Sequence, residues 1–163
     1  MKYLGLNVYS EIGKLRKILL HRPGEEVENL TPEYLKLLLF DDIPYLEIAK
    51  KEHDYFADVF RKNSVEVLYL EDLAAEALKD KNVKEIFITE AISESRVSIE
   101  DEKTILKEYL ISLSTKEMIM KVMSGIRRKE VGLSEKGQNY PFLMDPMPNL
   151  YFTRDPFSII GSG

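Results

Sequence analysis

Residues 149–155, Asn-Leu-Tyr-Phe-Thr-Arg-Asp, bring two aromatic rings, an arginine and an aspartate together after a proline-rich turn. Asp155 precedes Pro156, and proline restricts the residue before it and lacks an N–H, so the interior of a helix or strand is disfavoured there. The pattern predicts a short extended segment that carries a carboxylate out of the end of a sheet. A fixed carboxylate beside a ring suits a planar cation such as a guanidinium, with one face stacked and one edge bound.

Asp155 also fits a simpler role, which is to brace the turn before Pro156. In an extended segment Asn149 and Asp155 share one face and Phe152 lies on the other, because side chains alternate along a strand. A pocket that uses both Phe152 and Asp155 therefore needs a bend or bulge between them. Arg154 is expected opposite Asp155, as a structural partner rather than a second ligand.

The other candidates for chemistry are few. The chain contains no cysteine, so it offers neither a thiol nucleophile nor a disulfide. Its two histidines are far apart and match no metal-binding motif, so we expect no metal and no cofactor. His53 lies on an apolar helical stripe and is interpreted as a hydrogen-bonded core residue. His21 ends a predicted strand, where a general-base role is the less favoured alternative.

The apolar pattern predicts an α/β fold class. Residues 15–21 form a short apolar run typical of a core strand, and residues 65–69 alternate as a strand does. Residues 43–63 carry apolar side chains at helical spacing. The order strand, helix, strand predicts a parallel pair with the helix packed on one face. A shorter helix is expected over residues 31–40, with Thr31 as its N-cap.

Residues 71–126 are predominantly helical in pattern, with four apolar stripes and no obvious chemistry. Ser114 and Glu117 have the spacing of a capping box, and Ser98 with Asp101 have a similar spacing.

These patterns divide the chain into three parts. Residues 1–70 are the first α/β module or modules, residues 71–128 an inserted helical bundle, and residues 129–163 a loop and strand that return to the sheet. The final residues indicate a strand that enters a glycine turn, which predicts a truncated polypeptide, with a natural flexible tail as the alternative.

Composition narrows the class of partner. The hydrophobic content of 44% allows a core, and the net charge of −5 argues against a nucleic-acid partner. No signal peptide is recognised, and no apolar run approaches the roughly 20 residues of a membrane span. We therefore expect a soluble, cytoplasmic protein without a membrane partner.

Three segments resemble the N-terminal part of bacterial arginine deiminase, a family of the guanidine-modifying superfamily. They are residues 8–24, residues 38–42 and residues 147–156, in the family's order and with roughly its spacing. The resemblance implies a pentein-type five-bladed α/β propeller, of which only the first modules are present, with an inserted helical bundle. It also implies hydrolysis of L-arginine to L-citrulline and ammonia through a cysteine-linked amidino intermediate, and a homo-oligomer at full length.

Residue by residue, the resemblance makes Asp155 the first of two carboxylates that clamp the guanidinium. Phe152 matches a ring that lines the guanidinium pocket, and Asn149 a residue that helps hold the amino-acid end of the substrate. Leu39 matches a residue on a mobile loop that covers the substrate. The family's nucleophilic cysteine, catalytic histidine and second acid are implied beyond residue 163, so the isolated chain is expected to be inactive.

Two alternatives remain open. One is another guanidine-modifying enzyme, such as an amidinotransferase or an agmatine or dimethylarginine hydrolase, although the helical insert and residues 38–42 favour a deiminase. The other is a non-catalytic propeller fragment that acts as a binding module. A downstream reading frame with His-x-Asp and a late cysteine would support the enzyme.

Overall fold

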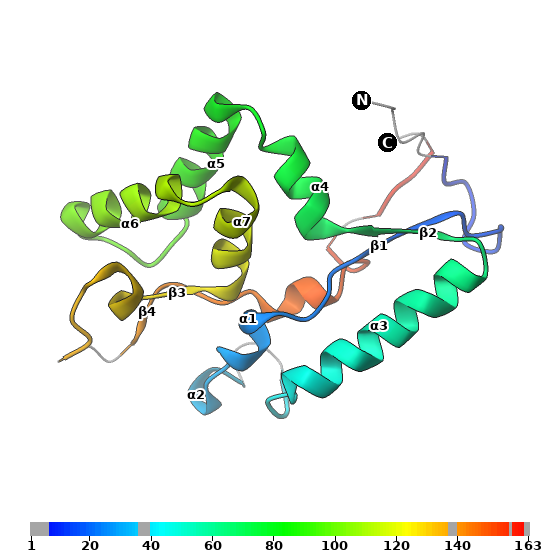
Figure 1. The fold of residues 1–163 in the computed structure, drawn as a ribbon, viewed down its shortest axis with the longest axis horizontal. Coiled ribbons are helices and arrows are strands. Elements are labelled where there is room, and N and C mark those ends of the chain that lie inside the picture. The colour runs from blue at the N-terminus through cyan, green and yellow to red at the C-terminus, as the bar shows by residue number, and fades with distance from the viewer. Residues whose placement is uncertain (1–6, 36–39, 137–139, 157, 162–163) are drawn as a thin grey trace.

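The computed structural model describes residues 7–35, 40–136, 140–156 and 158–161 and has an α/β architecture with small sheets. Figure 1 shows two adjoining parts, a strand–helix–strand unit and a group of helices, joined by one helix between them.

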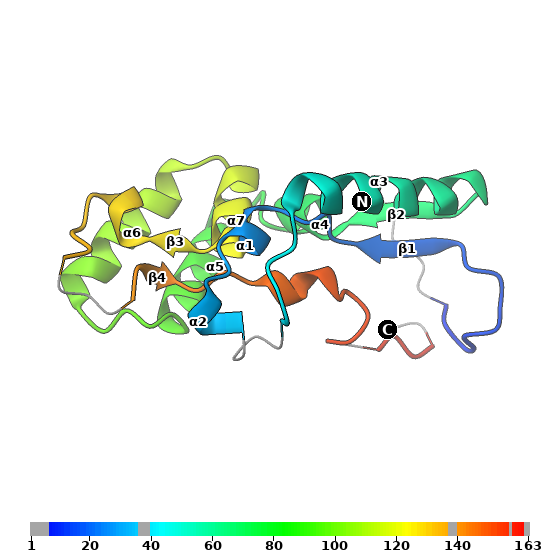
Figure 2. The same ribbon diagram turned by 90° about the horizontal axis from the view of Figure 1, so that it is seen from below.

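The strand–helix–strand unit confirms the parallel pair. Strand β1 (Lys17–Leu20) pairs in parallel with β2 (Glu66–Tyr69), so that Ile18 lies opposite Val67. Helix α3 (Leu46–Lys62) connects them and runs alongside the sheet in both views (Figures 1 and 2).

The apolar stripe of α3 is only partly buried. Leu46, His53 and Ala57 are buried, whereas Phe56 and Val59 are substantially exposed. The sheet of β1 and β2 has two strands, and α3 has 17 residues. Because so small a sheet cannot cover the whole apolar face of α3, part of that face remains exposed among the described residues. Two short helices, α1 (Glu25–Glu28) and α2 (Pro32–Leu35), lie between β1 and α3. The helix expected over residues 31–40 is present at Pro32–Leu35, and residues 36–39 lie outside the described part.

The second part confirms the helical middle of the chain. Its helices pack on a common core of Ile88, Leu106, Leu110, Met118 and Ile119, all fully buried or nearly so. They are α4 (Leu70–Ala77), α5 (Lys81–Ser93), α6 (Glu100–Ser112) and α7 (Thr115–Ser124). None of the helices in the described residues is long and apolar enough to cross a membrane.

The two expected helix starts have different outcomes. The Ser114 hydroxyl accepts a hydrogen bond from the Glu117 N–H, and the Glu117 carboxylate accepts one from the Ser114 N–H, which confirms the capping box. The expectation for Ser98 is wrong, because Ile99 is the N-cap of α6 and makes no side-chain cap.

The region expected as a loop contains regular structure. Strand β3 (Ile126–Arg127) pairs antiparallel with β4 (Phe142–Met144), and a 3-10 helix, η1 (Arg128–Val131), follows β3. Ile126, Leu143 and Met144 belong to the same buried cluster as α5–α7. The apolar core of the helices therefore continues into this small sheet.

A buried histidine links the end of strand β1 to helices α1 and α4. His21 directly follows β1, and only 1% of the residue is exposed. Its Nε2 lies 3.0 Å from Glu26 Oε1, and its Nδ1 lies 3.1 Å from Glu71 Oε2. Glu71 is in α4 directly after β2, so the parallel pairing of β1 and β2 brings it to His21. Glu26 reaches the ring from α1, and the Gly24 N–H donates to its Oε1 at 2.5 Å.

The two carboxylates determine the charge of this ring. Only the imidazolium can donate to both carboxylates, because a neutral ring has a single N–H. Burial opposes the charged form and lowers the pKa of His21, but the hydrogen bonds and negative charges of Glu26 and Glu71 outweigh it and raise the pKa to about 9. A buried cation with both nitrogens occupied does not fit a general base, so His21 is a structural residue.

The first prediction concerns pH. The folded-state pKa of His21 exceeds its ordinary value of 6.5, so its stabilising contribution is complete below pH 6.5 and is lost as the pH rises to about 9. We expect the free energy of unfolding to fall by about 3 kcal/mol over that range. Urea denaturation at several pH values measures the change, and His21→Gln should remove it. Level stability from pH 6.5 to pH 9 in the parent chain would contradict a charged His21.

The second prediction concerns Gly24. A Cβ at this position would lie 2.6 Å from Glu26 Oε2, so Gly24→Ala requires the Glu26 carboxylate to shift, and we expect this shift to weaken its contact with His21. We expect a loss of about 1–3 kcal/mol, because a buried charged partner loses its hydrogen bond. The control is Gly13→Ala, whose Cβ has its nearest neighbour at 4.0 Å. Equal stability of the two alanine variants in thermal melts would argue against the contact.

Candidate functional site

The segment that follows β4 runs back beneath β1, as Figure 2 shows. It forms a 3-10 helix, η2 (Pro148–Tyr151), followed by a turn over residues 153–156. The expectation of an extended segment over residues 149–155 is therefore wrong. Pro148 occupies the first helical turn, where its fixed φ favours a helical start. The strict alternation of faces no longer applies, and the bend between Phe152 and Asp155 that a shared pocket needs is present.

Asn149 and Phe152 lie on this bent backbone. The Phe152 N–H donates to the Asn149 carbonyl at 3.0 Å, which closes the 3-10 turn. Asn149 is exposed, and 48% of Phe152 is exposed. The amide and the ring are therefore open to an incoming group.

Asp155 is exposed within the turn over residues 153–156. Within the described part of the chain, no residue donates a hydrogen bond to its carboxylate and no cation pairs with it at contact distance. Residue 157, where an aspartate that braces a turn finds its donor, lies outside the described residues. Arg154, its neighbour, forms an exposed ion pair with Glu11 at 2.8 Å. Leu39, the fourth expected site residue, also lies outside the described residues.

His53 packs beneath this segment. Only 4% of His53 is exposed, and the ring of Tyr151 lies edge-on to its imidazole at a centroid distance of 6.2 Å. The rings of Phe56 and Tyr69 lie at 6.5 and 6.0 Å. Neither ring nitrogen of His53 has a hydrogen-bond partner among the described residues, so the expectation of a hydrogen-bonded core histidine is wrong. Burial is the main cause that lowers its pKa, and the neutral ring packs as part of an aromatic cluster.

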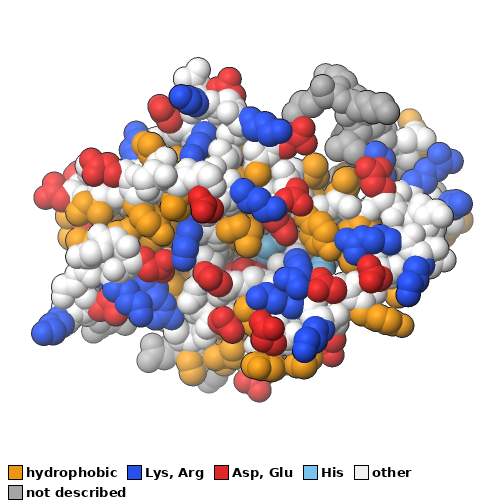
Figure 3. All heavy atoms as spheres, viewed as in Figure 1, with side chains coloured by type: hydrophobic (Ala, Val, Ile, Leu, Met, Phe, Trp, Pro, Cys, Tyr) orange, Lys and Arg blue, Asp and Glu red, His pale blue; other side chains and the backbone are white. Residues whose placement is uncertain are grey.

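Charges of both signs cover one face of the molecule (Figure 3). Figure 3 shows positive and negative side chains interspersed over one face, with hydrophobic side chains between them and histidine atoms near the middle. Among the described residues no group of three or more acidic or histidine side chains is arranged to hold a metal ion.

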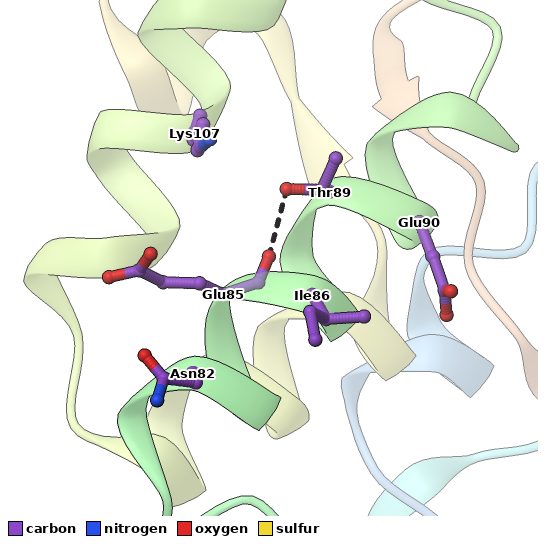
Figure 4. A pocket seen from close by; sticks show the side chains of 6 residues that line it. All are labelled: Asn82, Glu85, Ile86, Thr89, Glu90 and Lys107. Atoms are coloured by element: carbon purple, nitrogen blue, oxygen red, sulfur yellow. Dashed lines mark hydrogen bonds between the residues drawn. The ribbon is translucent and has the colours of Figure 1, made fainter.

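A separate hollow of about 450 Å³ lies between α5 and α6. Figure 4 shows its polar side chains on the helix surfaces, with the Thr89 hydroxyl bonded to the Glu85 carbonyl of its own helix. None of its lining residues belongs to the segment after β4. They are Asn82, Glu85, Ile86, Thr89, Glu90 and Lys107.

The segment after β4 thus carries an amide, an aromatic ring and a carboxylate, all exposed, on one bent stretch of backbone. A carboxylate and an aromatic ring are groups that can bind a flat cation, but these residues supply no nucleophile. The segment is held by contacts with His53 and with Leu19 in β1. Local sequence patterns do not predict these contacts, because they join residues far apart in the chain.

Comparison with known proteins extends this picture. Residues 36–163 match the family model for arginine deiminase. Arginine deiminases of Bacillus cytotoxicus and of a Bacillus cereus strain are each 54% identical over 165 residues, which cover 97% of this chain and 40% of theirs. That of Streptococcus agalactiae is 54% identical over 168 residues, covering 97% of this chain and 41% of its own length. The chain spans about 40% of the relatives' length. It belongs to the arginine deiminase family.

Proposed function

We propose that this chain is the N-terminal part of an arginine deiminase, a hydrolase that converts L-arginine and water to L-citrulline and ammonia in the cytoplasm. In this proposal Asp155 binds one edge of the guanidinium, Phe152 lines the pocket, Asn149 holds the amino-acid end, and Leu39 belongs to the covering loop. The observation that supports it most strongly is the family match over residues 36–163, which includes all four positions.

The charge and the exposure of the Asp155 carboxylate support this role. A carboxylate without a described cation partner, exposed on a bent segment, is free to accept two hydrogen bonds from a planar guanidinium. Attack on the guanidinium carbon requires that this group be held flat and oriented. A cysteine thiolate would add to the guanidinium carbon and ammonia would leave, and water would then add to the covalent amidino intermediate and release citrulline and the thiolate. The chain has no cysteine, so these 163 residues do not supply that thiol.

The same proposal extends to the architecture. The parallel β1–α3–β2 unit belongs to the first module or modules of a five-bladed propeller over residues 1–70. Residues 71–128 form the inserted helical bundle, and residues 129–163 return to the propeller. The full-length enzyme is a homo-oligomer.

The third prediction uses a chimaera in which this chain replaces the matching segment of the Bacillus cytotoxicus deiminase. We expect the chimaera to form citrulline from arginine. Asp155→Asn should lower kcat/KM by about 100-fold or more, because the charged acceptor for the guanidinium is lost. A colorimetric citrulline assay measures both. The matched control is Asp58→Asn, since Asp58 forms only an exposed ion pair with Arg61, and such pairs contribute little.

Two results would contradict the assignment of Asp155. One is an Asp155→Asn chimaera as active as its parent, and the other is an equal loss in Asp58→Asn.

The fourth prediction concerns the chain by itself. Without a cysteine it should release no citrulline from arginine, even at long incubation times. Mass spectrometry of the reaction mixture, with the active chimaera as positive control, tests this. Citrulline above the enzyme-free blank would show that thiol chemistry is not required.

A further inference from the structure

Residues 146–156 are attached to the rest of the fold at their start, middle and end. The Met147 N–H donates to the Met123 carbonyl at 2.9 Å, which ties the start of the segment to α7. Tyr151 packs on His53 in the middle. The Thr153 hydroxyl donates to the Leu19 carbonyl at 2.8 Å and ties the end of the segment to β1.

The Leu19 carbonyl belongs to the open edge of β1. The Arg16 carbonyl accepts from the Glu66 N–H at 2.8 Å, so residue 16 directs its carbonyl toward β2. Carbonyls alternate along a strand, so that of Leu19 points to the edge away from β2. The sheet has two strands, β1 and β2, within the described residues. Thr153 therefore satisfies a carbonyl that pairing with β2 cannot reach.

We propose that Thr153 is a positioning residue for Asp155: its hydrogen bond to the open edge of β1 sets where the guanidinium-binding carboxylate stands. This inference rests on the proposed function. Thr153 and Asp155 share one turn, so displacement of the first moves the second.

The other described contacts near Asp155 are less able to fix the position of its carboxylate. The ion pair of Arg154 with Glu11 is about 80% exposed on both sides, and such pairs fix geometry weakly. The backbone bridge between Val8 and Gly161 lies beyond Asp155, and its two hydrogen bonds of 2.7 and 2.8 Å hold Gly161 rather than the turn. Tyr151 is 46% exposed and contacts His53 only through its ring.

The position of the Asp155 carboxylate affects how well it can bind a guanidinium. A carboxylate binds a guanidinium best through two parallel hydrogen bonds, which require a defined distance and plane. A displacement of about 1 Å in such a group can reduce catalysis by about 100-fold. Thr153 touches no substrate in this proposal, so its effect reaches the reaction only through Asp155.

The test compares two variants of the chimaera. Thr153→Val keeps the shape of the side chain and removes its hydroxyl, whereas Thr153→Ser keeps a hydroxyl at this position. We expect Thr153→Val to raise KM for arginine by about fivefold or more and to lower kcat/KM accordingly, whereas Thr153→Ser stays near the parent. Hydrogen exchange on the 163-residue chain provides a second readout. Amides of residues 150–155 should exchange faster in Thr153→Val and not in Thr153→Ser, with the amides of α7 unchanged.

The outcomes separate this inference from the proposed function. If Asp155→Asn is inactive while Thr153→Val keeps the parent's KM and exchange rates, the inference fails and the proposed function stands. If Thr153→Val and Thr153→Ser lose activity equally, the hydroxyl is not the cause and the inference also fails. If Asp155→Asn matches the parent, the proposed function fails and takes the inference with it. Should Thr153→Val not fold, Thr153→Ala replaces it in the same comparison.

Discussion

The buried contact of His21 with Glu26 and Glu71 is the constraint on which the arrangement of the first part depends. It joins the ends of β1 and β2 to α1 and α4 through one imidazolium. A buried ion pair of this kind adds little net stability over an apolar contact, but removal of one partner leaves a buried charge uncompensated. The cluster therefore constrains the geometry of these elements as well as stabilising the charged ring. The position of β1, and with it the open edge that Thr153 contacts, follows from this joint.

The ionisable groups divide into two sets by burial. His21, Glu26 and Glu71 are buried and occupied by one another, which suits them to a structural role. Asp155 is exposed and has no partner among the described residues. An exposed carboxylate without a partner can accept hydrogen bonds from a cation, whereas a carboxylate already paired within the fold must first be released.

Sequence patterns predicted the elements that depend on local signals. The strand–helix–strand unit followed from apolar periodicity, and the cap at Ser114 from its spacing to Glu117. The contact of Glu71 with His21 was not predicted, although parallel pairing brings the residues just after β1 and β2 to the same end of the sheet. The bent form of residues 149–155 was not predicted, because an aromatic run favours a strand locally whereas Pro148 starts a helical turn. The packing of His53 against Tyr151 was missed because its partners are distant in sequence.

We propose that residues 149–155 form one side of a guanidinium site. A crystal structure of the chimaera with arginine bound, in which the cysteine proposed as nucleophile is replaced by alanine, distinguishes this site from an unrelated surface. We expect two guanidinium nitrogens within about 3 Å of the Asp155 carboxylate oxygens and the Phe152 ring against the same group. An Asp155 carboxylate that faces solvent while other residues hold the guanidinium would contradict it.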